Sequence, residues 1–471
     1  MNKIIMTMVV GVFTLVGTLA FWAKDADAIP VFARKYGMSC NSCHTMFPKL
    51  TKMGVAFRER GFRFAEGKDD FDMQNDVGKN MDAEESPSAV WASSFPFTVR
   101  TQVLYSGAGP VTDGADIPVM PGHRFGMLDG ALVQNAAGQW QSNYKVGFGE
   151  LGLISSGSYD NLFWWLDANQ NGIGMLEVGY YVNDLLKVRF GRIQNNVGYG
   201  MTMMSQRPLG FGAIDNAQMV GGTMLMMGDG ISIHGTTNGD SGVGSYYTLS
   251  LTTNGKVPGA ATNLAAVDPS IAGRQSYAVY GRVAQEIMDN HIIGVYGYSA
   301  KNWVSDAMGG EAVMLMGMAM GPAAAPTATA MQFSKVSRYG VDFAFNYGEP
   351  FQIFGGLTFG KNTNPVTKQN LDVRALTVVA EWKATDNILV GAKINQLQVD
   401  LQMNGLKAQT PAKTTYLTGY LLYQVAQNVQ GFATVTRATN AVVDMRGIPG
   451  FGTRATQQTF TTGIVGLDIA L

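Results

Sequence analysis

Charge is scarce in this chain. Of its 471 residues, 15% are charged, and the formal net charge is −1. A near-neutral chain offers no electrostatic basis for binding nucleic acid, so no nucleic-acid partner is expected. The hydrophobic content of 46% excludes wholesale disorder. The length fits two or three ordinary domains, or a single large barrel.

Long apolar runs are scarce too, and the one at the N-terminus predicts an export signal. Lys3 precedes the apolar residues Ile4–Leu19, and an A-x-A motif ends at Ala28. This order is typical of a secretory signal peptide over residues 1–28, cleaved after Ala28. A membrane anchor is the alternative, but the run is short and charge returns at Lys24. We therefore expect the mature chain to lie outside the cytoplasm.

Only two cysteines occur, Cys40 and Cys43, and His44 follows them directly. The sequence C-N-S-C-H matches C-x-x-C-H, the attachment signature of c-type haem. The two thiols of such a motif bond to the two vinyl groups of one porphyrin, and the next residue places an imidazole on the iron. The motif predicts one covalent haem c, with Cys40 and Cys43 as the thioether residues and His44 as an axial ligand of the haem iron.

Three other uses of the motif are weaker. A thioredoxin-like redox pair would need a surrounding βαβ pattern, which the sequence lacks. A structural zinc site would need a fourth ligand, and a plain disulfide would leave His44 without a role. The remaining histidines lie far away in the sequence: His123, His234 and His291.

The second axial ligand stays open. A methionine thioether is common in this position and raises the reduction potential. With 27 methionines in the chain, proximity alone assigns none of them. Four lie near the motif: Met38, Met46, Met53 and Met73.

The haem motif belongs to a short cytochrome segment, residues 29–65. After the motif, Thr45–Arg60 predicts a helix with Leu50, Met53 and Phe57 on one face. A segment of this size is too short to bury a porphyrin by itself. The walls of the haem site must therefore come from elsewhere in the chain.

An acidic linker is predicted over residues 66–92, where Asp and Glu are frequent. A solvated linker is the favoured interpretation, and a cation-attracting vestibule is the alternative. Residues 93–471 then form the second unit, in which the sequence pattern predicts short strands.

These strands alternate apolar and polar side chains. Leu186, Val188 and Phe190 share one face, and Lys187 and Arg189 the other. The same alternation runs through 95–99, 376–383 and 465–471. One apolar face and one face that tolerates charge fit a membrane barrel. Basic residues that could line its lumen are Arg100, Lys187, Arg189 and Arg192.

The connections divide into tight turns and long loops. Turns are predicted at 183–184, 239–244, 289–290, 348–350, 386–387 and 427–428, and loops near 194–228, 254–274, 300–336, 360–372, 400–412 and 438–456. This division indicates an outer-membrane antiparallel β-barrel of about 16 strands. Aromatic girdles are expected at Phe163-Trp164-Trp165 and Tyr180-Tyr181. A soluble sandwich or propeller is the alternative, and the absence of a fixed repeat disfavours it.

The two units fit each other. A segment without a core of its own precedes a barrel wide enough to hold more than side chains. We therefore expect the α-helical cytochrome segment to lodge in or against the lumen and to plug it. A haem held there could carry electrons across the membrane.

Residues 30–64, PVFARKYGMSCNSCHTMFPKLTKMGVAFRERGFRF, resemble the fused monohaem cytochrome–porins, the outer-membrane iron oxidases of iron-oxidising bacteria. Phe-Ala-Arg-Lys-Tyr leads into C-x-x-C-H, and Phe-Pro follows it. The resemblance implies that extracellular Fe(II) donates electrons through one haem to a periplasmic cytochrome, from a barrel embedded in outer-membrane lipid. It carries over the haem roles of Cys40, Cys43 and His44 alone. One departure is the C-terminal Ile-Ala-Leu, where such barrels commonly end in an aromatic residue.

Other functions stay open. The same architecture could carry electrons outward or take them from another donor, since the direction depends on the reduction potential. It could also be a solute porin with the haem segment as a plug. The run Met314–Met320 could bind Cu(I), although a flexible apolar loop is the favoured interpretation. No His or carboxylate cluster is spaced as a dedicated iron site, so outer-sphere transfer is expected.

Overall fold

A computed structural model describes the chain over most of its strands and part of the cytochrome segment. The described residues are 40–46, 49–62, 97–108, 132–134, 140–142, 144–159, 161–169, 172–194, 223–224, 227–237, 244–253, 255–256, 277–288, 290–301, 314–315, 318–319, 335–346, 349–364, 369–403, 406–407, 412–426, 429–442 and 457–470. The predicted signal peptide (1–28) and acidic linker (66–92), and also His123, Met38 and Met73, lie outside them.

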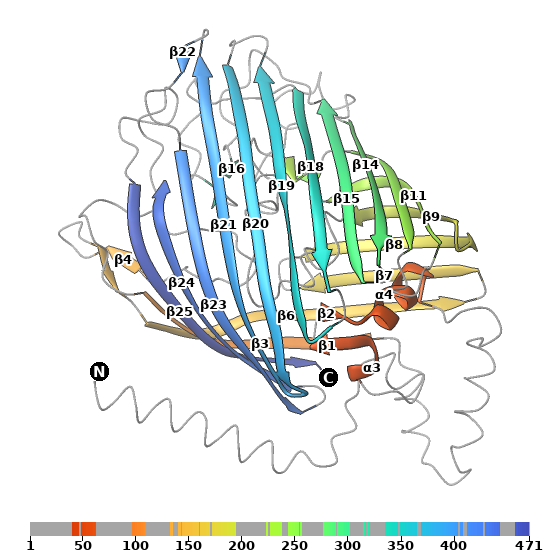
Figure 1. Cartoon of the computed structure of the whole chain (residues 1–471), viewed down its shortest axis with the longest axis horizontal. Helices are drawn as coiled ribbons and strands as arrows, with labels where there is room; N and C mark the ends of the chain where they lie inside the picture. The colour runs from red at the N-terminus through yellow and green to blue at the C-terminus, as the bar shows by residue number, and fades with distance from the viewer. Residues whose placement is uncertain are drawn as a thin grey trace.

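The core of the fold is a closed antiparallel barrel (Figure 1). Sixteen strands of eight or more residues form it within the described part, which confirms the predicted fold class and strand number. They are β3 (Phe97–Ala108), β6 (Tyr144–Tyr159), β7 (Leu162–Asn169), β8 (Gly172–Asn183), β9 (Leu186–Gln194), β11 (Met227–Thr236), β12 (Ser245–Thr253), β14 (Tyr277–Ile287), β15 (His291–Lys301), β18 (Lys335–Phe345), β19 (Phe351–Asn364), β20 (Gln369–Thr385), β21 (Ile388–Met403), β23 (Ala412–Ala426), β24 (Val429–Val442) and β25 (Gln457–Ala470).

Each of these strands pairs with the next along the chain, and β25 closes the barrel on β3. The two-residue strand β22 (Leu406–Lys407) extends the pairing at the end of β21. Three further short pairs lie in the long connections: β4 (Leu132–Gln134) with β5 (Trp140–Ser142), β10 (Thr223–Met224) with β13 (Gly255–Lys256), and β16 (Met314–Leu315) with β17 (Met318–Ala319). The methionine-rich run therefore contains a small hairpin where a loop was expected.

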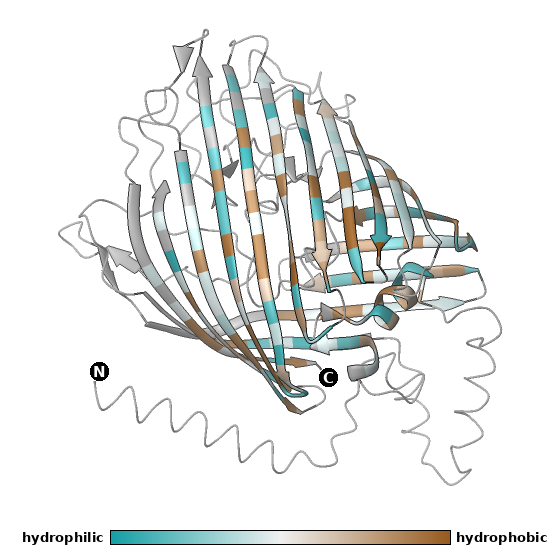
Figure 2. Cartoon of the chain, in the orientation of Figure 1, coloured by the Kyte–Doolittle hydropathy of each residue, from teal (hydrophilic) through white to brown (hydrophobic). Residues whose placement is uncertain are grey.

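The strands are polar inside and apolar outside, which confirms the alternation. On β9, Lys187 is fully buried in the barrel while Phe190 is 51% exposed on the outside. On β20, Thr377 is buried and Trp382 is 56% exposed. Figure 2 shows the resulting alternation of hydropathy along the strands. An inverted surface of this kind is stable only where lipid, and not water, surrounds the barrel.

The two ends of the barrel differ in their connections. One end, called the turn end here, carries the connections 160–161, 184–185, 237–244, 288–290, 346–350, 386–387 and 427–428. The opposite loop end carries 109–143, 170–171, 195–226, 254–276, 302–334, 365–368, 404–411 and 443–456. In outer-membrane barrels the short turns face the periplasm and the longer loops face the exterior.

Three details of the predicted connections were wrong. The turn at 160–161 was missed, and the connection 170–171 is short although it lies at the loop end. The predicted loops 360–372 and 400–412 are largely strand, because β19, β20 and β21 extend well beyond the apolar band. These extensions contain many polar residues, so their composition resembles that of loops.

The described cytochrome segment contains α3 (Cys40–Cys43), β1 (His44–Met46), β2 (Lys49–Leu50) and α4 (Lys52–Glu59). The predicted helix Thr45–Arg60 is therefore wrong in its first half. A proline at position 48 lacks an amide proton and disfavours helix at the residue before it, so the helix begins only at the next capping residue, Thr51. Among the described helices, none is long and apolar enough to cross a membrane.

Candidate functional site

The cysteine motif forms one short turn of helix. In α3, Cys40 and Cys43 stand three positions apart, a spacing that places both on one side of a helix. His44 follows as the first residue of β1. Cys43 and His44 are half-buried, while the side chain of Cys40 is outside the described part. This donor set, two thiols on one helical side and an adjoining imidazole, fits a covalent haem c.

Thr51 ties this turn to the following helix. Its amide donates to the carbonyl of Cys43 (2.9 Å), and its hydroxyl donates to the carbonyl of Ser42 (2.9 Å). The same hydroxyl caps α4 by accepting from the amide of Gly54 (3.1 Å). A Cβ atom at Gly54 would lie only 2.1 Å from the carbonyl oxygen of Cys43, so the close approach of the two helices requires glycine. The motif and α4 thus form one unit.

Helix α4 ends in a Schellman motif that aims Phe62 into the barrel. The amide of Phe62 donates to the carbonyl of Phe57 (2.9 Å), and that of Gly61 donates to the carbonyl of Arg58 (3.0 Å). Gly61 has φ +73°, as this motif demands, and Phe62 also has a positive φ of 65°. The rings of Phe57 and Phe62 meet edge to face, 6.1 Å apart. Both rings are buried.

An aromatic seat on the inner wall of the barrel receives this end of the segment. Phe163 of β7 is buried with Phe57 and Phe62, and Trp165 and Tyr181 pack against the cluster. The ring of Phe62 stacks on that of Trp165 with centroids 5.6 Å apart. The expected lodging of the segment against the lumen is therefore present.

The predicted aromatic girdle was wrong for three of its five members. Phe163, Trp165 and Tyr181 face inward and contact the cytochrome segment. Tyr180, in contrast, is 45% exposed on the outer face, as a girdle residue should be. Inward aromatic residues find an apolar environment here only because the segment covers them.

Polar contacts surround the aromatic seat. The guanidinium of Arg60 lies 3.6 Å from the carboxylate of Asp184, in the β8–β9 turn. Glu59, buried on α4, lies 3.9 Å from Nε2 of His234 on β11. Lys187 donates from Nζ to the carbonyl of Asp184 (2.6 Å). Because Asp184 belongs to a turn between strands, these contacts place the segment at the turn end of the barrel.

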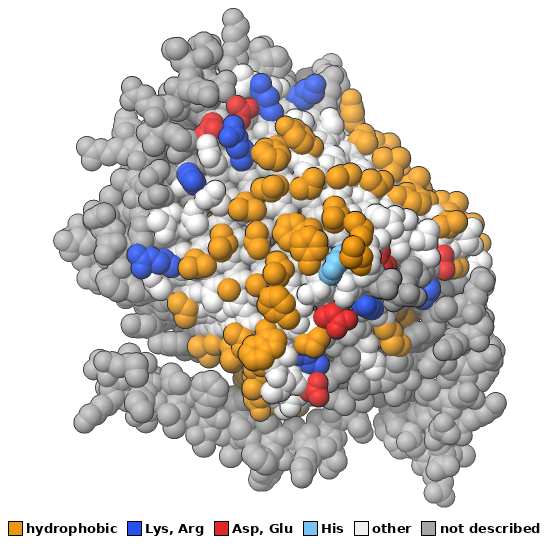
Figure 3. All heavy atoms as spheres, viewed as in Figure 1, with side chains coloured by type: hydrophobic (Ala, Val, Ile, Leu, Met, Phe, Trp, Pro, Cys, Tyr) orange, Lys and Arg blue, Asp and Glu red, His pale blue; other side chains and the backbone are white. Residues whose placement is uncertain are grey.

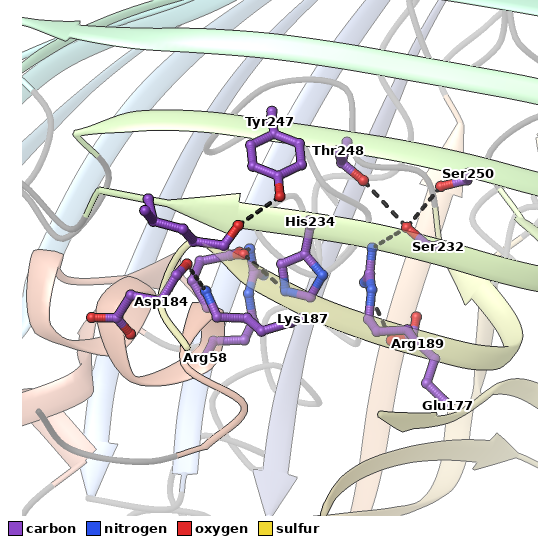
Figure 4. A network of polar contacts seen from close by, with 12 residues as sticks. Arg58, Glu177, Asp184, Lys187, Arg189, Ser232, His234, Tyr247, Thr248 and Ser250 are labelled. Carbon is purple, nitrogen blue, oxygen red and sulfur yellow. Dashed lines mark hydrogen bonds and ion pairs between the residues drawn. The ribbon is translucent and has the colours of Figure 1, made fainter. Parts of the chain in front are cut away.

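The network continues along the inner wall (Figure 4). Arg189 lies between Glu177, 3.3 Å from its guanidinium, and the hydroxyl of Ser232, to which it donates at 3.2 Å. Ser232 in turn contacts the hydroxyls of Thr248 (3.3 Å) and Ser250 (2.9 Å). The segment is thus bound to a lumen wall that is itself rigidly hydrogen-bonded.

The sequence-predicted lumen cations divide between the two faces. Lys187 and Arg189 lie inside and belong to the network around the segment. Arg100 also lies inside, where it pairs with Asp468. Arg192 was wrongly placed: its side chain is 43% exposed on the outer face and pairs with Asp229 (3.0 Å).

Several contact residues were missed from the sequence, and of the four candidate methionine ligands only the side chain of Met53 is described. Glu59, Asp184 and His234 were not singled out, because their partners lie far away along the chain. Met53 is 37% exposed on α4, and the side chain of Met46 is outside the described part. In the described residues no group of three or more His, Cys, Asp or Glu side chains could hold a metal ion.

Comparison with solved structures gives the same architecture. The chain is similar to the anion-selective porin from Comamonas acidovorans (12% identity, 80% of this chain and 98% of that chain covered, TM-score 0.50). The fold is that of an outer-membrane β-barrel. Further similar structures are the outer-membrane expressed OmpT of Vibrio cholerae (11% identity, 80% and 97% covered, TM-score 0.47) and the Salmonella typhi OmpF complex with daunomycin (11%, 80% and 97%, TM-score 0.48). No family model and no curated protein matches the chain.

Proposed function

We propose that this chain is an outer-membrane c-type cytochrome that oxidises extracellular Fe(II) and passes the electron to a periplasmic carrier. The observation that carries the proposal is the seating of the Cys40–His44 motif, the only cysteine motif in the chain, in a segment bound inside a membrane barrel. A barrel that served only as a solute pore would not need a haem-attachment motif at its mouth.

The motif residues would hold one haem c. Cys40 and Cys43 would supply the thioether bonds, and His44 would ligate the iron. A bound haem supplies reversible one-electron chemistry. The chain's own contribution is to fix the motif through Thr51 and to anchor α4 to the lumen wall through Glu59 and Phe62.

The position of the segment suits electron exchange with a periplasmic carrier, and the reduction potential of the haem would set the direction of flow. At the turn end it lies on the periplasmic side, where a soluble carrier can approach. One Fe(II) ion would lose one electron on the lumen side, and the carrier would accept one electron on the periplasmic side, so the transfer balances. The polar lumen wall, with Arg189, Ser232 and their partners, would let hydrated iron enter.

Stopped-flow absorbance tests the proposal directly. The purified, oxidised protein, made with a cytochrome-maturation system, would be mixed anaerobically with Fe(II). We expect rapid appearance of a reduced c-type spectrum, from haem that resists extraction under denaturing conditions. Cys40→Ala and Cys43→Ala should lose stable covalent haem, and His44→Ala should alter the ligation spectrum. An unchanged haem spectrum in all three variants would sink the proposal.

Two alternatives make different predictions. If the haem stays oxidised in Fe(II) but is reduced by another donor, or has a strongly negative potential, outward transfer or a different donor is favoured. If the protein conducts ions freely in a planar bilayer, a solute porin with a plug is favoured.

A further inference from the structure

Charged side chains gather on the outer face of the barrel near the loop end. We propose that this band binds the phosphate groups of a phosphorylated glycolipid in the outer leaflet. Five outward cations define the band, which we name the cation band: Lys335, Lys361, Arg374, Lys413 and Arg437. All five are exposed, and each comes from a different strand, β18, β19, β20, β23 and β24. The proposal does not depend on the haem.

The five cations point outward because they share a face with exposed apolar residues. On β18 the burial alternates from Lys335 to Phe345, with both of these residues exposed. Arg437 is two positions beyond Val435, which is 59% exposed. The pairing of β19 with β20 sets Phe359 against Arg374, so an outward aromatic ring adjoins the band. Side chains on this face meet lipid or its headgroups, never the lumen.

The cations lie at one level of the membrane. Register partners show that the band moves toward the turn end by about eight residues between Lys335 and Arg437, across five strand-to-strand steps. Barrel strands tilt by roughly 35–45°, so neighbours at equal height differ by one to two residues in register. The observed drift matches that tilt. In Figure 3 the blue and red side chains in the upper left of the view form a band between the orange field and the grey region, and further charged side chains lie in the lower part of the view.

Along the barrel axis, the cation band is separated from the outward aromatic residues at the turn end by the height of the apolar band. Ten positions separate Lys335 from Phe345, Lys361 from Phe351, and Lys413 from Tyr423, and all three aromatic residues are exposed outward. Ten residues span about 33 Å of strand, which at a tilt of about 40° covers roughly 25 Å of height. That is the usual height of the apolar band of an outer-membrane barrel, about 25 Å. The cations therefore reach the headgroup level of the outer leaflet.

Two carboxylates lie within the band and reduce its charge. Asp372 and Asp400 are register partners on β20 and β21, and Gln398 donates to both carboxylate oxygens of Asp400 (3.1 and 3.0 Å). Five cations against two carboxylates leave an excess of three positive charges. An excess of this size on a membrane-level surface attracts anionic headgroups. Phosphate is the anion that outer-leaflet glycolipid presents at this height.

Native mass spectrometry in detergent tests the proposal. The probes are diphosphorylated lipid A, the same lipid without its phosphates, phosphatidylethanolamine and inorganic phosphate. The variant is Lys361→Gln/Arg374→Gln/Lys413→Gln, and the control is Lys383→Gln, a cation at the turn end of β20. Heat-modifiable mobility in electrophoresis verifies that each variant is folded.

Wild type and Lys383→Gln should bind the phosphorylated lipid equally, and salt should weaken the binding. The triple variant should bind it about 100-fold more weakly, a loss of roughly five-fold for each cation. Equal binding by the triple variant, by the lipid without phosphates or by free phosphate would overturn the proposal. So would an equal loss in Lys383→Gln, because the effect would then be one of net charge and not of this band.

Discussion

The ring of Phe62, in the cytochrome segment, stacks on the ring of Trp165, in barrel strand β7, with centroids 5.6 Å apart and planes 18° from parallel. This contact joins two parts of the chain that lie about a hundred positions apart in the sequence. It makes the aromatic seat the main apolar attachment of the segment, since Phe57, Phe163 and Tyr181 pack around the same pair. The predictions below begin from this attachment.

Trp165→Ala should loosen the segment without unfolding the barrel. Removing a large aromatic side chain from a packed cluster costs about 3 kcal/mol, and here the loss falls on the docked state. We expect faster cleavage of the segment in limited proteolysis and a higher single-channel conductance. Trp164→Ala is the matched control, because Trp164 adjoins it on β7 and instead donates to the hydroxyl of Ser155. Equal effects of the two substitutions would show that the seat is not what holds the segment.

Glu59→Gln should weaken the polar half of the same attachment. Glu59 is buried opposite His234 and pairs with Arg58 (3.0 Å), so its neutral analogue leaves buried positive charge less well compensated. A loss of about 2 kcal/mol is expected, read as a lower urea concentration for exposure of the segment to protease. Asp386→Asn, in an exposed turn, serves as the control and should change nothing. A silent Glu59→Gln would mean that aromatic packing alone holds α4.

A substitution at Gly179, on barrel strand β8, tests how closely the segment and the barrel fit together. A Cβ atom at Gly179 would come within 2.1 Å of the ring of Phe163, and one at Gly61 within 2.6 Å of the same ring. Gly179→Ala should therefore displace Phe163 and destabilise docking by about 2 kcal/mol. Adding Phe163→Leu should recover part of that loss, measured as a coupling energy in a double-mutant cycle. Strict additivity would indicate that the two sites do not share this ring.

Thr51→Val should weaken the connection between the haem motif and α4. The substitution keeps the shape of Thr51 but removes the hydroxyl that caps α4 and donates to Ser42, at a cost of about 1 kcal/mol. We expect less covalent haem per polypeptide and a changed Soret circular dichroism spectrum, with both restored in Thr51→Ser. Thr45→Val is the control, because the buried hydroxyl of Thr45 makes no hydrogen bond with the residues that the structure describes. Identical spectra in Thr51→Val and wild type would remove Thr51 from any role in haem placement.

Local periodicity was sufficient to predict the barrel, and long-range packing was not. Alternation around Lys187 assigned both faces of β9 correctly, since one face must meet lipid and the other the lumen. Strict alternation also places Arg192 on the face of Phe190, so its assignment to the lumen was an avoidable error. Alternation also places Trp164 and Trp165 on opposite faces of β7, so they could not both belong to a lipid-facing girdle; which of the two faces inward could not be predicted from the sequence. Only the docked segment makes the interior apolar at that point.

In the candidate site, too, some features follow from local sequence patterns and others depend on long-range packing. The Cys40–Cys43 turn is a local pattern, so the sequence alone predicts it. The pairing of Glu59 with His234 depends on how the segment enters the barrel, and a single histidine in a strand carries no sign of it. The capping role of Thr51 could have been predicted, because a threonine ahead of an apolar helix is a typical cap. Its second hydrogen bond, to the haem motif, could not have been predicted from the sequence.

The ion pair that joins the first and last barrel strands, β3 and β25, leads to a prediction about barrel closure. Arg100 of β3 and Asp468 of β25 form a bidentate ion pair on the inner face, and Gln102 also donates to Asp468 (2.9 Å). Both charges are buried, so Asp468→Asn should leave Arg100 uncompensated and destabilise the barrel by about 3 kcal/mol. The expected readout is a lower temperature for loss of the folded electrophoretic form. Replacing both partners, as Arg100→Met/Asp468→Leu, removes the unpaired charge and should restore much of the lost stability. A double variant as unstable as Asp468→Asn would show that the seam depends on the ion pair itself, and not merely on avoiding a buried charge.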